Sequence, residues 1–137
     1  MDEVIRRITI IKVRKPKKND LNDELQWFSH SLGLFNIRDK EKSTFRIFIE
    51  LLKAAKTNTS LTSDEIAERS NLSRATVVHH LAKLIEQGIV TAHKRRYYLR
   101  DPSLNELVKE LRKDMNRMFD DLEEQANNID IEMGLED

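Results

Sequence analysis

Two adjacent histidines, His79 and His80, lie in the segment Asn71–Val90 (NLSRATVVHHLAKLIEQGIV), a few residues after Arg74. A pair of imidazoles is typical of a metal site. An arginine beside a helix N-terminus favours instead the binding of a phosphate. The faces of the predicted helix on which these side chains lie distinguish the two chemistries.

Helical geometry places the two histidines differently. Successive residues of an α-helix are rotated by about 100°, so Val77, Leu81 and Leu84 form one apolar stripe that we expect to be buried. His80 lies at the edge of this stripe, where we expect it to pack with one ring nitrogen satisfied. His79 points outward, where it can donate to a phosphate or a base edge.

The outward face of the same helix is small and apolar. Ala75, Val78 and Ala82 lie there beside His79, with Lys83 on the flank. Short side chains let a helix approach the floor of a DNA major groove, and methyl groups can contact thymine. This face therefore favours DNA over bulk water as its surroundings.

Polar and basic groups lie before and after this face. Ser73 and Thr76 begin the helix, where free N–H groups attract an anion, and Arg74 can reach a phosphate or a guanine. Two β-type segments around Lys94-Arg95 predict a hairpin with a basic tip, which can touch the phosphate backbone or enter a minor groove. The predicted DNA-binding residues are Ser73, Arg74, Ala75, Thr76, Val78, His79, Lys83, His93, Lys94, Arg95 and Arg96.

Metal binding and catalysis have little support in the sequence. The chain has no cysteine, and His79 and His80 diverge on the helix, whereas zinc requires three or four convergent ligands. No glycine-rich phosphate loop and no catalytic Ser-His-Asp or carboxylate pair is evident. We therefore predict no metal, no cofactor and no enzymatic activity.

Helices are expected to position these groups. Three glycines and two prolines among 137 residues favour helices over a many-turned β architecture. One amphipathic helix is expected after a cap at Asn19 or Asp20 and before Gly33, and a second after a cap at Asp39.

A third helix begins with a capping box of Thr62 and Glu65 and ends at Asn71. Only three or four residues separate it from the helix capped by Ser73, which is the connection length of a helix-turn-helix. A hairpin directly after a helix-turn-helix is the winged-helix arrangement. We therefore predict a mainly α fold with a small β-hairpin: a winged helix-turn-helix with a long C-terminal dimerisation helix.

Charge divides the chain into three parts. The formal net charge is zero, but residues 1–18 carry seven basic and two acidic side chains, and residues 101–137 carry four and twelve. We expect a basic N-terminal arm or strand in 1–18, a winged helix-turn-helix DNA-binding domain in 19–100, and a coiled-coil helix with an acidic tail in 101–137. The β-branched stretch Val4–Arg14 predicts a strand that pairs with another strand, for example one of a second subunit, or lies along a polyanion; a partly ordered terminus is the alternative.

The last helix is expected to begin with Asp101 as its cap and Pro102 as its first residue. Its apolar residues alternate by four and three over more than three heptads, with Gln125 in the same seam. At about 1.5 Å per residue the helix extends near 40 Å, too long to be buried against one small domain. The predicted homodimer seam consists of Leu104, Val108, Leu111, Met115, Met118, Leu122 and Ile129.

No apolar run approaches the roughly 18 residues of a membrane span. The absence of cysteine fits a reducing compartment. We therefore expect a cytoplasmic protein with no membrane partner.

The segment LSRATVVHHLAKLIEQGIV resembles the recognition-helix segment of ArsR-type winged-helix repressors, with a Leu-Ser start, a Thr-Val step, a His-His-Leu and a Gly-hydrophobic pair that opens the wing. The resemblance spans Phe45 to Leu99 and is shared with neighbouring groups such as the MarR type. It implies that Ser73–Lys83 form the DNA-reading helix, that His93–Arg96 form the wing tip, and that a homodimer binds a pseudo-palindromic operator. Metal-sensing members use cysteines, or Asp and His ligands on the last helix; this chain has no cysteine and no histidine beyond His93.

The sequence thus predicts a homodimeric, sequence-specific regulator of transcription that binds double-stranded DNA and represses by occlusion. Helix 73–87 would enter the major groove, and wing 93–96 would lie on the backbone or in the minor groove. The alternative is a winged-helix protein–protein interaction module without direct DNA binding, in which the exposed apolar face of the helix is a docking patch. The sequence does not specify an effector.

Overall fold

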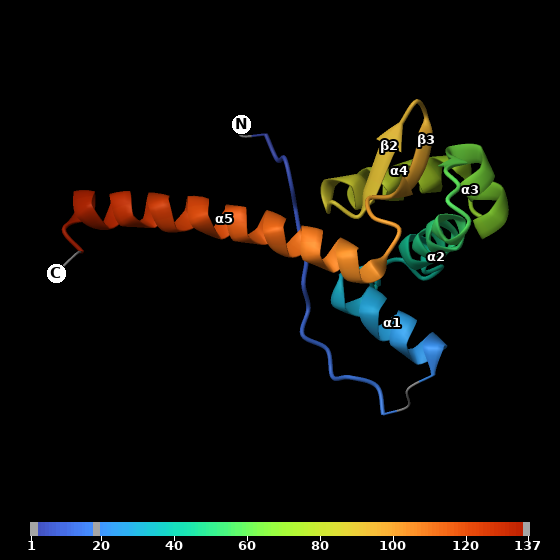
Figure 1. Cartoon of the computed structure of the whole chain (residues 1–137), viewed down its shortest axis with the longest axis horizontal. Coiled ribbons are helices and arrows are strands. Elements are labelled where there is room, and N and C mark those ends of the chain that lie inside the picture. Colours follow the sequence, from blue (N-terminus) through green and yellow to red (C-terminus); the bar gives the residue numbers. More distant parts are fainter. Residues whose placement is uncertain (1–2, 18–19, 136–137) are drawn as a thin grey trace. The chain divides into compact units, whose positions relative to one another are not determined.

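The computed structural model describes residues 3–17 and 20–135 (Figure 1). The chain divides into two compact units between Pro102 and Ser103. Within the described residues, the first unit holds four helices and a small antiparallel sheet, and the second holds one helix. The predicted fold class, a mainly α winged helix-turn-helix with a β-hairpin and a long C-terminal helix, is confirmed.

The elements follow one another in the predicted order, with one short strand that the sequence did not indicate. They are α1 (Leu21–Ser31), α2 (Ser43–Lys56), β1 (Leu61–Thr62), α3 (Ser63–Ser70), α4 (Arg74–Glu86), β2 (Val90–His93), β3 (Arg96–Leu99) and α5 (Leu104–Met133).

Helices α1 and α3 begin at caps that the sequence predicts. Asp20 caps α1 by accepting from the Asp23 N–H at 2.8 Å, whereas Asn19 lies outside the described residues. The box at the start of α3 is complete, because Thr62 N–H donates to Glu65 and Glu65 N–H donates to the Thr62 hydroxyl.

Two predicted caps are wrong. The residue before α2 is Lys42, in left-handed conformation and without a side-chain cap, while the Asp39 carboxylate accepts from the Thr44 N–H inside the first turn. Helix α5 begins after Ser103 and not after Asp101, because the Ser103 hydroxyl accepts from the Glu106 N–H. The Ser103 hydroxyl thus satisfies one of the first N–H groups of α5, which is the role that the sequence assigned to Asp101.

The N-terminal arm is not a strand. In the described part of the arm, the chain runs as an extended segment without a sheet partner (Figure 1). Its N–H groups find acceptors at helix ends instead: Arg7 N–H donates to the Glu86 carbonyl at 3.1 Å, and Ile11 N–H donates to the Ser31 carbonyl at 2.7 Å. The β-branched residues did produce an extended backbone, but the carbonyls left free at helix C-termini took the place of a strand edge.

The sheet has the order β1-β3-β2, so the second strand of the wing is central. Leu61 pairs with Tyr97, and Thr62 pairs with Arg96. Two residues are too short a strand to leave a period-two signal, which is why β1 was missed.

Helix α2 forms the centre of the first unit, where it contacts α3, α4 and β3. Ile47, Phe48 and Leu51 on α2 are buried, as are Leu61 in β1 and Ile66 in α3. The helix-turn-helix and the wing therefore share one core.

Helix α5, taken by itself, has 30 residues and is about 45 Å long. Large apolar side chains are exposed along its second half, among them Phe119 at 53%, Leu122 at 63% and Ile129 at 51%. Among the described residues, no helix is both long and apolar enough to cross a membrane.

Candidate nucleic-acid interface

Helix α4 is oriented as its periodicity predicts. Val77, Leu81 and Leu84 are buried, with no more than 1% of each exposed. The residues expected to point outward are exposed: Arg74, Ala75, Val78, His79, Ala82 and Lys83. Val78, at 46% exposure, is the large apolar residue of this face.

His80 is a core-edge residue. Its Nδ1 is 2.8 Å from the Thr44 hydroxyl of α2, which satisfies one ring nitrogen as expected. Burial lowers the pKa of His80 below its usual 6.5; Asp39 partly offsets this effect, and Lys83 adds to it. The adjacent rings of His79 and His80 lie edge to face with centroids 5.2 Å apart, but within the described residues no group of three metal-ligating side chains is formed.

The turn between α3 and α4 is fixed from outside by Arg46 of α2. Its guanidinium donates to the carbonyl of Ser70 and, at 3.4 Å, to that of Asn71. Asn71 has the left-handed backbone that ends α3. Because Ser70 is the last residue of α3 and Asn71 is its C-cap, Arg46 holds the end of the first helix of the helix-turn-helix in place.

The hydroxyl groups of Ser73 and Thr76 take part in the N-terminal cap of α4. The Ser73 hydroxyl accepts from the Thr76 N–H at 3.1 Å and donates to the Thr76 hydroxyl at 2.8 Å. The first-turn N–H groups of Arg74 and Ala75 have no intrahelical acceptor. The N-terminus of α4 can therefore receive a phosphate through its main chain, with the two hydroxyls as its rim.

Two neighbouring acids on α3 form ion pairs, one with the start of α4 and one with the base of the wing. Asp64 lies 3.4 Å from the Arg74 guanidinium, and Glu65 lies 3.5 Å from that of Arg96. The Arg74–Asp64 pair is highly exposed and so contributes little stability, within about 0–1 kcal/mol. Arg74 can therefore exchange Asp64 for a phosphate at low cost.

The wing tip carries two cations in a conformation that ordinary residues avoid. Strand β2 ends at His93 and β3 begins at Arg96, so Lys94 and Arg95 alone form the turn. Their φ angles are 50° and 64°, as a type I′ turn requires, and such turns favour Asn-Gly. A left-handed backbone costs an L-residue roughly 1–2 kcal/mol, so the tip gives up stability and keeps charge.

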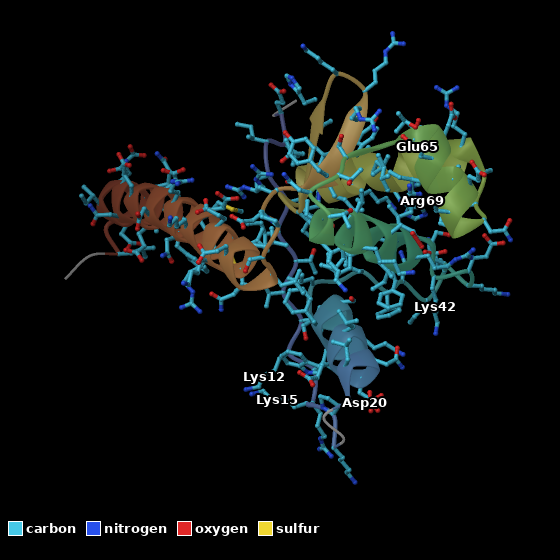
Figure 2. All side chains as sticks on the ribbon, turned by 45° about the vertical axis from the view of Figure 1, so that its right-hand side comes forward. Lys12, Lys15, Asp20, Lys42, Glu65 and Arg69 are labelled. Atoms are coloured by element: carbon cyan, nitrogen blue, oxygen red, sulfur yellow. The ribbon has the colours of Figure 1, made fainter. Side chains whose placement is uncertain are left out.

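Unlike Lys94 and Arg95 of the turn, Arg96 is held by contacts within the protein. It donates to the Ser60 hydroxyl at 2.8 Å and to the Ser60 carbonyl at 2.9 Å, in addition to its ion pair with Glu65. Figure 2 labels Glu65 and Arg69, which project from α3 among the polar side chains of this region. Arg96 thus ties the wing to β1 and α3, a role that the run of basic residues in the sequence did not reveal.

The N-terminal arm reaches the other end of α4. The Arg6 guanidinium donates to the Ile85 carbonyl at 3.1 Å, and the Arg7 guanidinium pairs with the Glu86 carboxylate at 2.7 Å. Cations are favourable at a helix C-terminus because they face its free carbonyls. The only signal of this contact in the sequence was the basic character of the arm.

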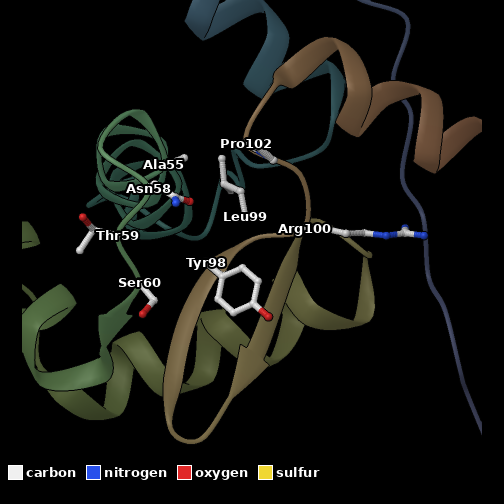
Figure 3. A pocket seen from close by; sticks show the side chains of 8 residues that line it. All are labelled: Ala55, Asn58, Thr59, Ser60, Tyr98, Leu99, Arg100 and Pro102. Atoms are coloured by element: carbon white, nitrogen blue, oxygen red, sulfur yellow. The ribbon is translucent and has the colours of Figure 1, made fainter.

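A cavity of about 340 Å³ opens between the end of α2 and β3 (Figure 3). Figure 3 shows the Tyr98 ring and the Ser60 side chain facing this space, while Arg100 extends toward the N-terminal arm. Its lining mixes apolar and polar side chains and includes none of the predicted DNA-binding residues: Ala55, Asn58, Thr59, Ser60, Tyr98, Leu99, Arg100 and Pro102.

Comparison with protein families gives one result that bears on this surface. Residues 41–91 match the family described as winged helix-turn-helix DNA-binding. The match covers α2, β1, α3, α4 and the start of β2, and it supports a DNA-binding regulator of the winged helix-turn-helix type. Searches of curated proteins and of solved structures gave no match.

Substitution of each histidine by glutamine separates their roles. The unfolded chain binds a proton at position 80 more readily than the folded protein does. The neutral form of His80 therefore makes its full contribution to the free energy of unfolding above pH 6.5, and this contribution is lost as the pH falls below that value. We expect His80→Gln to lose this part of the pH dependence in urea unfolding between about pH 8 and about pH 5.

His79→Gln is the matched control, because its ring lies on the exposed face of α4. It should keep most of the pH dependence of the unmodified protein, since His79 is the smallest of the causes that lower the pKa of His80. Equal pH dependence in the His80→Gln variant and the unmodified protein would contradict the assignment of His80 to the core edge.

Proposed function

We propose that the chain, which carries a winged helix-turn-helix domain, is a homodimeric regulator of transcription that binds specific sequences in double-stranded DNA. Helix α4 would enter the major groove, and the wing at 93–96 would lie on the phosphate backbone or in the minor groove. The observation that carries this proposal is the outward face of α4, which is small, partly apolar and bounded by Arg74 and Lys83.

The side chains on this face suit base readout. Ala75, Ala82 and the half-exposed Val78 allow close approach and can contact thymine methyl groups. His79 can donate to a base acceptor, and Arg74 can donate to guanine or phosphate. The remaining proposed contacts position the helix on the backbone: Ser73, Thr76, Lys83, His93, Lys94, Arg95 and Arg96.

Dimerisation through α5 would present this face twice. The proposed seam of Leu104, Val108, Leu111, Met115, Met118, Leu122 and Ile129 is extended by Phe119 and Met133, which fall on the same stripe of the helix at about 100° per residue. Phe119, Leu122 and Met133 are at least half exposed, and burial of each such side chain is worth roughly 1.5–3 kcal/mol. Two recognition helices about 34 Å apart would then read a pseudo-palindromic operator.

The regulator is proposed to act as a repressor of the ArsR-like kind, by occluding its operator. The resemblance of the α4 segment supports this part of the proposal. We propose no metal for this regulator, because the chain departs from the metal-sensing members in having no cysteine and no histidine beyond His93.

A protein-docking module is the second candidate, and the exposure of Val78 favours it. The same small apolar face of α4 would then receive a protein and not a major groove. Binding to duplex DNA distinguishes the two candidates.

Selection of bound fragments from random duplex DNA, followed by anisotropy titrations at several salt concentrations, tests the proposal. We expect one enriched, pseudo-palindromic motif. If the dimer binds about six to ten phosphates, affinity should fall on the order of 10³–10⁵ between about 50 and 200 mM salt. Absence of duplex binding at low salt would favour the docking module.

The wing tip offers a test in which stability and DNA binding change in opposite directions. The double variant Lys94→Asn/Arg95→Gly places preferred residues in the left-handed turn. We expect the free energy of unfolding to rise by about 1 kcal/mol. DNA affinity should fall, and the slope of its logarithm against the logarithm of salt concentration should become shallower by roughly 0.9 for each phosphate that the variant no longer neutralises.

The control is Lys109→Gln/Lys113→Gln, which also removes two positive charges, but from exposed positions on α5. It should leave the salt dependence unchanged. If the wing variant binds DNA as tightly as the unmodified protein, the tip does not contact the backbone.

The dimer seam is tested by two variants of α5, one with carboxylates in the seam and one with a carboxylate on the opposite face. Leu122→Glu/Ile129→Glu places carboxylates in the proposed seam, so we expect a monomer by sedimentation equilibrium and a loss of operator affinity greater than about tenfold. Ile131→Glu lies about 200° from Ile129 and is also exposed, at 56%. A dimer that survives the seam variant, or dissociates equally in the Ile131 variant, would reject this interface.

A further inference from the structure

A second cavity, of about 360 Å³, lies where the N-terminal arm crosses α1 and the loop that leads to α2. Val13 and Pro16 form the arm side of it. The arm is held there by two hydrogen bonds: the Trp27 indole N–H donates to the Val13 carbonyl at 3.0 Å, and Ile11 N–H donates to the Ser31 carbonyl at 2.7 Å. The cavity is thus built by the tertiary fold of the first unit.

Aromatic side chains provide its apolar surface. Trp27 and Phe35 both line the cavity. The Phe35 ring is fixed between two others, with the Phe45 ring 4.8 Å away and the His30 ring 6.0 Å away at a right angle. Two aromatic rings held in place in this way favour a flat ligand, which can stack without reordering the protein.

Cations outnumber acids around the aromatic surface. Arg14 and Lys42 line the cavity, as does the carboxylate of Asp23. The Lys42 ammonium lies 5.8 Å from the Phe35 ring centre, and the Lys42 backbone is held in left-handed conformation, with φ 55°. Arg14 makes no ion pair with any described residue, so its charge is available to a ligand.

We propose that this cavity binds a small aromatic carboxylate. The ring of the ligand lies against Trp27 and Phe35, and its carboxylate pairs with Arg14 and Lys42. A guanidinium and an ammonium that line the same apolar surface match an anion attached to a ring. Asp23 can accept from a hydroxyl or amino substituent on the ligand, which would add selectivity among aromatic acids.

Trp27 makes the proposal directly measurable, because it is the single tryptophan of the chain. Its indole N–H gives one resolved signal in a ¹H–¹⁵N spectrum, and its fluorescence is not mixed with that of another tryptophan. Phenylacetate is the probe; benzyl alcohol and phenethylamine present the same ring without a charge and with a positive charge. We expect a saturable shift of the indole signal with phenylacetate only.

Variants separate the site from general attraction to a basic arm. Figure 2 labels Lys12, which projects from the arm, and Lys42, which projects from the loop ahead of α2. Arg14→Gln/Lys42→Gln should weaken phenylacetate binding by about tenfold or more, equivalent to about 1.4 kcal/mol. Lys12→Gln removes an exposed cation of the same arm that does not line the cavity, and it should bind as the unmodified protein does.

Three results would overturn the proposal: no saturable shift up to the solubility limit of phenylacetate, equal or tighter binding of phenethylamine, or unchanged binding by the double variant. The remaining signals of the same spectrum show whether that variant is folded. The titration contains no DNA, so its outcome is independent of the proposed DNA binding.

Discussion

Burial of one stripe of α4 determines the functional geometry of the first unit. Val77, Leu81 and Leu84 have essentially no exposed surface, and rotating the helix by one residue would bring His79 or Val78 into the core and expose leucine to water. Loss of even one such leucine from the core costs several kcal/mol in typical proteins. This penalty fixes which residues α4 presents outward, and it does so before any ligand is considered.

The interactions that the sequence revealed are local, and those it concealed are distant. The faces of α4, the Thr62–Glu65 box and the two-residue turn of the wing follow from spacings of one to four residues. Arg96 and its partner Ser60 are 36 residues apart, and the arm and its partners on α4 are 79 residues apart. Periodicity contains no information about such pairs, so it showed a basic wing and a basic arm without their anchoring roles.

The same limit explains the candidate sites. Arg74, Val78 and His79 were identified because a helical repeat assigns each residue to a face, and the exposures agree. The aromatic cavity was not identified, since it requires Val13, Trp27 and Phe35 to meet through the path of the arm. Lys94 and Arg95 were predicted in part. The sequence indicated their turn, but only the structure shows that both residues have a left-handed backbone and so reduce stability.

The path of the arm also limits which amino acids two distant positions tolerate. A Cβ added at Gly33 would lie 2.8 Å from the Thr9 methyl, and one added at Gly88 would lie 2.8 Å from the Arg6 guanidinium. Both glycines have positive φ, a conformation that asparagine can also adopt. A side chain at Gly33 would nevertheless require Thr9 to move, and one at Gly88 would push aside the Arg6 guanidinium that donates to the Ile85 carbonyl. Glycine therefore fits both positions without any rearrangement of the arm.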